Sequence, residues 1–287
     1  MRISHSVVFT ALLAASVCVP TLGQTSATEF GQSLIASLPD SVPVTDPAER
    51  PQDNSAVRNE GTSGSLMYKS VHRGLEDQKQ LYLAPFEPSN LKWDALLLGG
   101  AAALFATDLQ IERVVPTSNL DRYHNVAAVS LVGTAVTLSG LWAYGIKTGN
   151  EHAKETGQLE LEALANTFLI YTPMQLIAAR ERPDEGRGSG RFLAQHSFNT
   201  SFPAGHPMFT WAMASVVAHE YPRPWVQLLA YGAAGSLSVS RVMGRNHFAS
   251  DVWVGTLLGY FIGSHIFHAR CVPGLSRSCH REVSSTE

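Results

Sequence analysis

The sequence predicts an all-α fold, a bundle of six helices, on the strength of three observations. Six apolar runs of helical length follow one another between residues 82 and 270. No segment alternates polar and apolar residues over enough positions to indicate a half-buried strand. The region is roughly 190 residues long, which is a usual size for one domain built around one core.

Each of the six helices has recognisable limits in the sequence. The third run ends at a proline, Pro183, because proline cannot continue a helix. The polar segments 147–158 and 184–201 are expected to be loops, and the second could lie over a site or be an idle surface loop. Gly99, Gly100, Gly232 and Gly235 would allow helices to approach closely. The expected helices are 92–108, 123–146, 160–180, 207–220, 225–243 and 250–269.

The chain outside the helical domain 82–270 divides into three parts. Residues 1–23 combine a basic start, a short apolar run and small residues, a pattern typical of a secretory signal peptide. An uncleaved anchor is the alternative, although the apolar run is short for a membrane span. Residues 24–81 are polar without a sustained apolar period, which predicts a flexible leader. Residues 271–287 form a polar tail.

Cysteine content is consistent with export. Removal of residues 1–23 would leave two cysteines, Cys271 and Cys279, eight residues apart around a Pro-Gly pair. In an oxidising compartment this pair can close a disulfide, and two free thiols are the alternative.

The charge balance excludes some classes of partner. The chain has 21 Lys and Arg residues against 24 Asp and Glu residues, so neither nucleic acid nor a strongly anionic surface is indicated. Most of the apolar runs reach about fifteen to twenty residues, near the lower limit for crossing a membrane. No pair of histidines among His219, His265 and His268 has the supporting ligands of a metal site, so no metal is expected.

The most informative stretch of the sequence places a cation, an imidazole and a carboxylate at short spacing. Ser240 and Arg241 are followed after five residues by His247 and after three more by Asp251. If a helix begins after Gly244, His247 and Asp251 share one of its faces. The carboxylate could then hold one imidazole nitrogen protonated and aim the other outward, as a nucleophile requires. A capped, solvated pair at a helix start is the structural alternative.

Two further polar groups stand at the ends of apolar runs. Pro203, Ala204, Gly205 and His206 form a turn before the fourth run, where a helix start offers unpaired N–H groups to an anion. Arg182 ends the third run directly before a proline, which leaves its guanidinium at the rim of the bundle.

The order Arg-Pro, then Pro-x-Gly-His, then Ser-Arg-x5-His-x3-Asp resembles the type 2 phosphatidic acid phosphatase and vanadium haloperoxidase superfamily, over roughly residues 93–267. The resemblance implies that His247 is the nucleophile of phosphoryl transfer, oriented by Asp251, and that His206 is the general acid and base. It also implies a bundle of that family's type, no metal, and a phosphate cradle that consists of Arg182, Arg241, Gly205, Ser240 and Gln175.

Two positions depart from the family pattern. Gln175 stands seven residues before Arg182, where the family has Lys, and Ala204 stands where it has Ser. The cradle therefore lacks one charge and one hydroxyl. Loss of a single transition-state donor can cost roughly a hundredfold to a thousandfold in rate. Arg180, Arg187, Arg191 and Arg245 are close enough in sequence to restore charge, although Arg180 would point away from Arg182 on a regular helix.

Three functions therefore remain open. The first is metal-independent hydrolysis of a phosphomonoester or a lipid phosphate, with vanadate as an inhibitor. The second is binding of phosphate or phospholipid without turnover, and the third is halide oxidation with vanadate as cofactor. If all six helices spanned a membrane after a cleaved signal peptide, Arg182 would face the cytoplasm, whereas the family works on the outer face. The sequence therefore favours a periplasmic or peripheral domain, with a membrane-embedded lipid phosphatase as the alternative. It does not fix the oligomeric state.

Overall fold

The computed structural model describes residues 60–185, 187–194 and 200–280, and within these ranges the chain contains helices and no strand. The all-α prediction is therefore confirmed for the described part. The helices expected from the sequence are present, with ends displaced by up to nine residues, and one more, α2, precedes them. The α-helices are α2 (Glu60–Leu83), α3 (Leu91–Val114), α4 (Leu120–Thr148), α5 (Glu151–Ala178), α6 (Gly205–Glu220), α7 (Pro224–Met243) and α8 (Ala249–Arg270), with short 3-10 turns η2 (Ala84–Phe86) and η3 (Pro88–Asn90) between α2 and α3.

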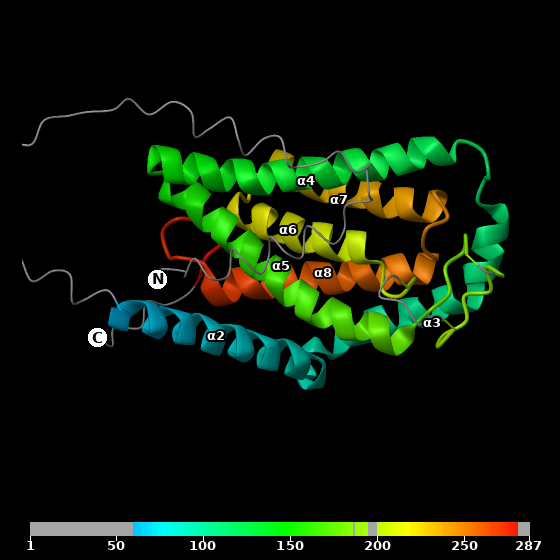
Figure 1. Ribbon diagram of the computed structural model, residues 1–287, viewed down its shortest axis with the longest axis horizontal. Coiled ribbons are helices and arrows are strands. Elements are labelled where there is room, and N and C mark those ends of the chain that lie inside the picture. The colour runs from blue at the N-terminus through cyan, green and yellow to red at the C-terminus, as the bar shows by residue number, and fades with distance from the viewer. Residues whose placement is uncertain (1–59, 186, 195–199, 281–287) are drawn as a thin grey trace, which may run out of the picture.

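Helices α4, α6, α7 and α8 run along the long axis of the molecule and α5 slants across them, with α2 along one side and α3 at one end (Figure 1). The packed centre lies between α5, α6 and α8. Its fully buried side chains include Leu159 of α5, Met208 and Val216 of α6, and Ile262 and Ile266 of α8. Burial of this apolar surface is the main stabilising contribution to the bundle.

Helices α6 and α8 approach each other closely along a row of three glycines on α8. A methyl group at Gly255 would lie 2.5 Å from the carbonyl oxygen of Ala204, and one at Gly259 would lie 2.1 Å from that of Met208. Gly263 faces the Ala212 carbonyl in the same way. The spacing of four residues places all three on one face of α8, so backbone contacts backbone here.

The glycines that the sequence suggested for close contact mostly do not have this role. A methyl group at Gly99, Gly232 or Gly235 would meet no atom within 4 Å. Only Gly100 is tightly packed, against the indole of Trp253. Small residues in an apolar run indicate that another helix could pack closely there, but where two helices do pack closely also depends on the position of the partner helix.

Two expectations about loops and leaders are wrong. Residues 60–81, predicted to be part of a flexible leader, are helical, and α2 is fixed to the bundle by a 2.5 Å ion pair between Asp77 and Arg270. Segment 147–158 is mostly helix as well, because α5 begins at Glu151 with the Asn150 side chain as its N-cap. The described part of 184–201 is a loop, as expected. The predicted signal peptide 1–23 and leader residues 24–59 lie outside the described residues.

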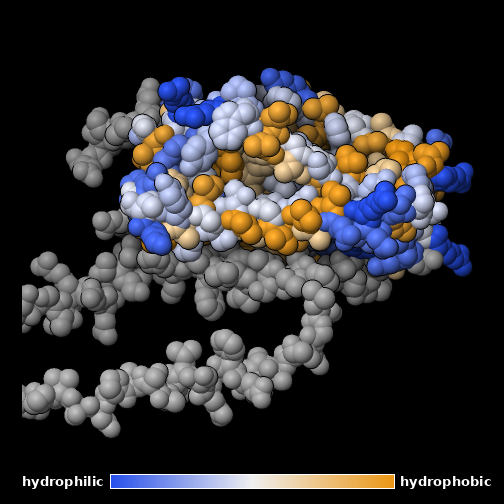
Figure 2. Space-filling model, turned by 90° about the horizontal axis from the view of Figure 1, so that it is seen from above, coloured by the Kyte–Doolittle hydropathy of each residue, from blue (hydrophilic) through white to orange (hydrophobic). Residues whose placement is uncertain are grey.

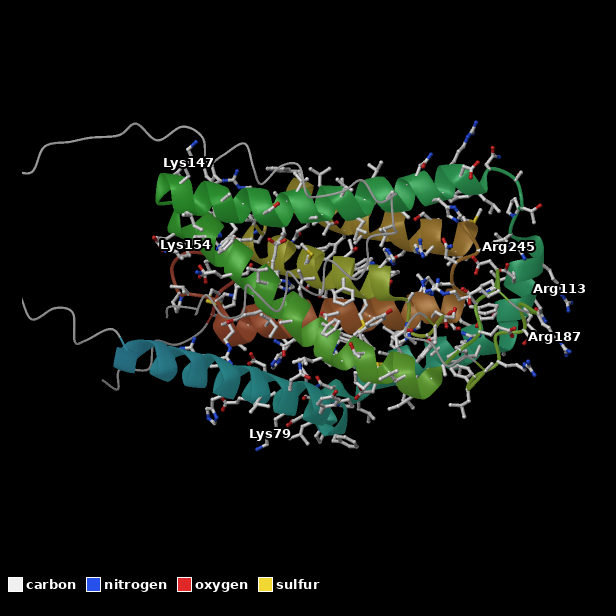
Figure 3. The ribbon with its side chains drawn as sticks, viewed as in Figure 1. Lys79, Arg113, Lys147, Lys154, Arg187 and Arg245 are labelled. Atoms are coloured by element: carbon white, nitrogen blue, oxygen red, sulfur yellow. A yellow bond between two sulfur atoms is a disulfide. The ribbon has the colours of Figure 1, made fainter. Side chains whose placement is uncertain are left out.

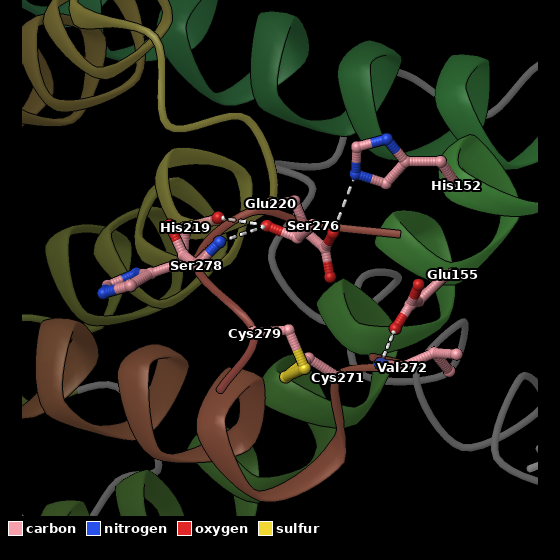
Figure 4. Close-up of a disulfide and its surroundings, with 9 residues drawn as sticks. All are labelled: His152, Glu155, His219, Glu220, Cys271, Val272, Ser276, Ser278 and Cys279. Carbon is pink, nitrogen blue, oxygen red and sulfur yellow. Dashed lines mark hydrogen bonds and ion pairs between the residues drawn. A yellow bond between two sulfur atoms is a disulfide. The ribbon is translucent and has the colours of Figure 1, made fainter. Parts of the chain in front are cut away.

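The chain beyond α8 folds back onto the bundle through a disulfide. Cys271 and Cys279 are bonded with their Cα atoms 5.8 Å apart, which confirms the disulfide rather than the free thiols (Figure 4). The Val272 N–H donates to the Glu155 carboxylate, and the Ser276 hydroxyl donates to the His219 carbonyl at 2.8 Å. This corner lies at the end of the bundle where α5 begins.

Two segments are long and apolar enough to cross a membrane. They are Pro88–Val114 and Leu120–Thr148, and only 11% and 6% of their most apolar windows are buried within the described structure. Exposed apolar side chains on them include Leu98, Val129 and Val136. Figure 2 shows hydrophobic residues spread along one face, with the strongly hydrophilic ones mainly toward its two ends. These features suggest association with a membrane.

The glycine row on α8 predicts a large effect of a small substitution. Gly259→Ala should lower the free energy of unfolding by about 3 kcal/mol, because the methyl group would push two helix backbones apart. The matched control is Gly235→Ala on α7, where space is open and the alanine should raise stability by roughly 0.5–1 kcal/mol. Denaturation of both full-length variants measures the difference. Equal stability of the two variants would contradict the close contact.

Candidate functional site

The three sequence motifs converge at the end of the bundle where α5 and α7 end and α6 and α8 begin. Arg182 follows α5, and its Nη1 donates to the carbonyl of Asn246, next to His247, at 3.1 Å. The charges of Arg182 and Arg241 both act on the imidazoles of His206 and His247. Two guanidinium groups and two imidazoles therefore share one site, as the motif order predicts.

His247 lies in the turn before α8 with its ring almost fully buried. Its Nδ1 is 2.7 Å from the carbonyl oxygen of Ser201. A carbonyl can only accept a hydrogen bond, so Nδ1 must carry the proton and Nε2 must carry the free lone pair. The ring is thus held in the tautomer that leaves the lone pair on Nε2.

The expected direct contact between Asp251 and His247 is wrong. Helix α8 begins at Ala249, so His247 precedes the helix and the two residues do not share a helical face. The Asp251 carboxylate instead accepts from the Phe248 N–H at 2.9 Å, which caps the helix, and from the Ser201 hydroxyl at 2.6 Å. Asp251 therefore reaches the imidazole of His247 only through Ser201.

The electrostatics of the site favour neutral imidazoles while no anion is bound. Burial, together with the positive charges of Arg241 and Arg182, lowers the pKa of His206 to about 4. Burial and the same two arginines hold the pKa of His247 well below its usual range. An anion between the arginines would offset their repulsion and raise the pKa of His206. The site is therefore built to take up a proton together with an anion.

The start of α6 offers backbone donors at the same place. The N–H groups of Gly205 and His206 have no acceptor among the described residues, as expected at a helix start. A Cβ atom added at Gly205 would lie 2.8 Å from the ring of Tyr171, so any side chain at this position would collide with that ring. Ala204 is completely buried and fixes the turn by donating its N–H to the Asp251 carbonyl at 3.1 Å.

Gln175 and Ser240, predicted to bind phosphate, have other partners. The Gln175 Oε1 accepts from both the N–H and the hydroxyl of Thr200, at 2.8 and 2.6 Å, and its Nε2 donates to the Pro203 carbonyl at 2.9 Å. The Ser240 hydroxyl donates to the Leu237 carbonyl of its own helix at 2.7 Å. Gln175 thus holds the turn before α6, and neither side chain is directed to an anion by these bonds.

The sequence does not predict the roles of several residues of the site region. Arg180 was expected within the third helix, but α5 ends at Ala178, and Arg180 turns into the protein to meet Asp108 and Asp251. Ser201 had no motif to mark it. The sequence position of Asp108 does indicate a paired carboxylate. Asp108 stands at the end of an apolar run, and a carboxylate that is buried there needs a partner.

The end of the bundle that holds the site carries several basic side chains. Arg113, Arg187 and Arg245 project at this end of the bundle, whereas Lys147 and Lys154 lie at the other (Figure 3). Arg245 is paired with Glu112 at 2.7 Å and so does not supply a free charge to the site. Exposed apolar side chains nearby in the chain include Ile177, Phe192 and Leu193. In the described part of the chain, no group of three His, Cys, Asp or Glu side chains is placed to hold a metal ion.

Comparison with known proteins finds a family pattern, a relative and a solved structure that resemble parts of this chain. The sequence pattern of the PAP2 superfamily matches residues 160–271, which contain all three motifs. A segment of 76 residues is 32% identical to the Lipid A 1-phosphatase of Porphyromonas gingivalis, and it spans 26% of this chain and 17% of that protein. A crystal structure of a transmembrane PAP2 type phosphatidylglycerolphosphate phosphatase from Bacillus subtilis matches 68% of this chain and 92% of its own, with 19% identity and a TM-score of 0.40.

The lowered pKa of His206 predicts that anion binding depends on pH. Sulfate remains a dianion in the neutral to mildly acidic range, so its affinity reports on the protein alone. The affinity should rise as pH falls from about 8 toward about 4, by up to roughly tenfold per pH unit, because each anion brings one proton with it. Calorimetry in two buffers with different ionisation enthalpies would measure the proton uptake. The His206→Gln variant should lose it, and an unchanged uptake in that variant would assign the proton to another group.

Proposed function

We propose that this chain, which matches the PAP2 superfamily pattern over residues 160–271, is a metal-independent phosphatase with His247 as its nucleophile. The observation that carries the proposal is the hydrogen bond from Nδ1 of His247 to the Ser201 carbonyl, which leaves Nε2 with a lone pair beside two arginines. A nucleophile in a positive field suits a phosphate ester, whose own negative charge otherwise repels attack.

The reaction follows from the positions of the two imidazoles. Nε2 of His247 attacks phosphorus, the bond to the leaving oxygen breaks, and protonated His206 gives its proton to that oxygen. Arg182, Arg241 and the first N–H groups of α6 stabilise the charge on the non-bridging oxygens. Water then attacks the phosphohistidine and loses a proton to His206 as the N–P bond breaks. Inorganic phosphate leaves, and both imidazoles return to their starting states.

We further propose a lipid phosphate as the substrate class, acted on at a membrane by an exported protein. The exposed apolar surfaces of α3 and α4 support membrane contact. Ile177, Phe192 and Leu193 could accompany acyl chains next to the cradle, because apolar side chains at a rim favour an amphipathic substrate. The name of the matching relative, a Lipid A 1-phosphatase, points to the same class. Soluble phosphomonoesters are the comparison class for the test.

Substitution of the nucleophile tests the proposal directly. The His247→Ala variant should release phosphate at least about a thousandfold more slowly than wild type, because no other group replaces Nε2. His268→Ala, at the far end of α8, is the matched control and should keep full activity. Phosphate release from lipid phosphates and soluble esters measures both variants. Rapid quenching should trap an acid-labile, base-stable phosphoryl group on wild type. Undiminished turnover by His247→Ala would refute the mechanism.

A phosphate-binding protein without turnover is the second candidate, because the cradle lacks the family's Lys and Ser. The contacts of Gln175 favour it in one respect, since that side chain is committed to Thr200 and Pro203. Saturable binding of phosphate or of a lipid phosphate, with hydrolysis no faster than in His247→Ala, would establish this candidate instead of the first.

The two departures from the family pattern should behave differently when they are reversed. Gln175→Lys should lower the free energy of unfolding by about 1–3 kcal/mol without raising kcat/KM, because Thr200 loses its acceptor. Gln175→Met, which also lacks that acceptor, is the control for stability. Ala204→Ser should raise kcat/KM by about tenfold, because a hydroxyl returns to the helix start beside the anion. A gain in rate for Gln175→Lys would mean that position 175 faces the substrate.

A further inference from the structure

The guanidinium of Arg180 joins segments that are far apart in the sequence. It is buried and makes four hydrogen bonds to protein acceptors. Nε donates to the Gly190 carbonyl at 3.0 Å, Nη1 donates to the Ser250 hydroxyl at 2.8 Å and to Asp251 at 2.5 Å, and Nη2 donates to Asp108 at 2.8 Å. A planar fork of donors suits this arrangement, and a lysine could not reproduce it.

Three aromatic rings enclose the same guanidinium. Its central carbon lies 4.3 Å from the ring centre of Phe248, 5.0 Å from that of Phe105 and 5.1 Å from that of Phe192. The rings come from α3, from the loop after α5 and from the turn before α8. They shield the charge from water, which strengthens its ion pairs. The charge is thus used within the protein, and Arg180 does not replace the cation missing from the phosphate cradle.

A short chain of hydrogen bonds connects this cluster to the nucleophile. Asp251 accepts from the hydroxyl of Ser201 at 2.6 Å, and the carbonyl of Ser201 accepts from Nδ1 of His247 at 2.7 Å. The Ser201 N–H donates to the Arg180 carbonyl at 2.8 Å. Ser201 is therefore held by Arg180 directly and again through Asp251. Its carbonyl is the group that fixes the tautomer of His247.

Helix α3 supplies the second carboxylate of the cluster. Asp108 accepts from Arg180, from the Ser250 N–H at 3.0 Å and from the Ser250 hydroxyl. Two carboxylates thus face one guanidinium, and burial raises the pKa of Asp251 to about 6, which leaves it ionised at neutral pH. The extra negative charge would stabilise an imidazole that becomes cationic when it is phosphorylated. Asp108 lies outside residues 160–271, the range of the family pattern.

From these contacts we propose that Arg180 and Asp108 are positioning residues for His247. They act through Asp251 and Ser201, and neither touches the substrate. Asp108 makes α3 part of the catalytic apparatus although it lies about 140 residues before the nucleophile. This inference rests on the proposed function for its kinetic consequence, but its structural consequence, the fixed tautomer of His247, can be measured without turnover.

The isosteric variant Asp108→Asn tests the proposal with a matched control. Asp108→Asn should lower kcat about tenfold and leave KM within about twofold, because the lost charge acts on the transition state rather than on substrate binding. Glu112→Gln is the control. Glu112 also belongs to α3 and pairs with Arg245 in the turn before α8, but this pair has no link to Ser201. Its kcat should not fall, because the substitution can only release the Arg245 guanidinium toward the site and leaves the contacts of Ser201 intact.

Nitrogen NMR of the full-length protein, labelled in its histidines and purified in detergent, provides the readout that needs no activity. Comparison with His247→Ala assigns the signal. Wild type should show Nδ1 of His247 protonated and Nε2 unprotonated, and Arg180→Lys should show a mixture of tautomers. A purely structural role would change the melting temperature but not the tautomer or kcat. An unchanged tautomer in Arg180→Lys, or equal kcat in Asp108→Asn and Glu112→Gln, would overturn the proposal. If wild type fails to turn over while the tautomer responds as stated, the proposed function fails and the positioning role stands.

Discussion

A guanidinium buried in an apolar bundle must be matched by acceptors, and the structure around the site depends on how Arg180 meets that requirement. A guanidinium without any carboxylate partner would be an uncompensated charge, which is among the costliest changes that a protein interior can undergo. The acceptors come from α3, from the loop after α5 and from the start of α8. The same cluster therefore closes the end of the bundle and sets the position of Ser201, whose carbonyl orients His247.

The sequence predicts the helices well because apolar periodicity is a local property. It predicts α2 poorly, since that helix is polar and gains its place through isolated contacts such as Asp77 with Arg270. It also identifies the wrong glycines. The close contact between α6 and α8 depends on Gly255, Gly259 and Gly263, which face backbone carbonyl groups at the start of α6 and within it. The sequence around a glycine does not show which residue of another helix packs against it.

For the candidate site, too, the sequence predicts which motif residues come together but not all of the contacts that they make. The motif residues Arg182, His206, Arg241 and His247 do come together. The predicted contact between His247 and Asp251 is wrong, because α8 starts two residues after the histidine. The prediction that Arg180 is helical is wrong as well, because α5 ends at Ala178. Both errors concern the exact ends of helices, which sequence patterns locate only to within about a turn.

The two halves of the site have different tolerances to substitution for a physical reason. The proposed phosphate cradle is a sum of several donors, so the loss of one charge or one hydroxyl would reduce stabilisation of an anion but leave the other donors in place. The orientation of His247 has no such redundancy, because a single carbonyl, that of Ser201, accepts from Nδ1. Departures at Gln175 and Ala204 are therefore compatible with a working nucleophile. A departure at Ser201 or Asp251 would act on the reacting nitrogen itself, since it would release the ring from the only tautomer that can attack.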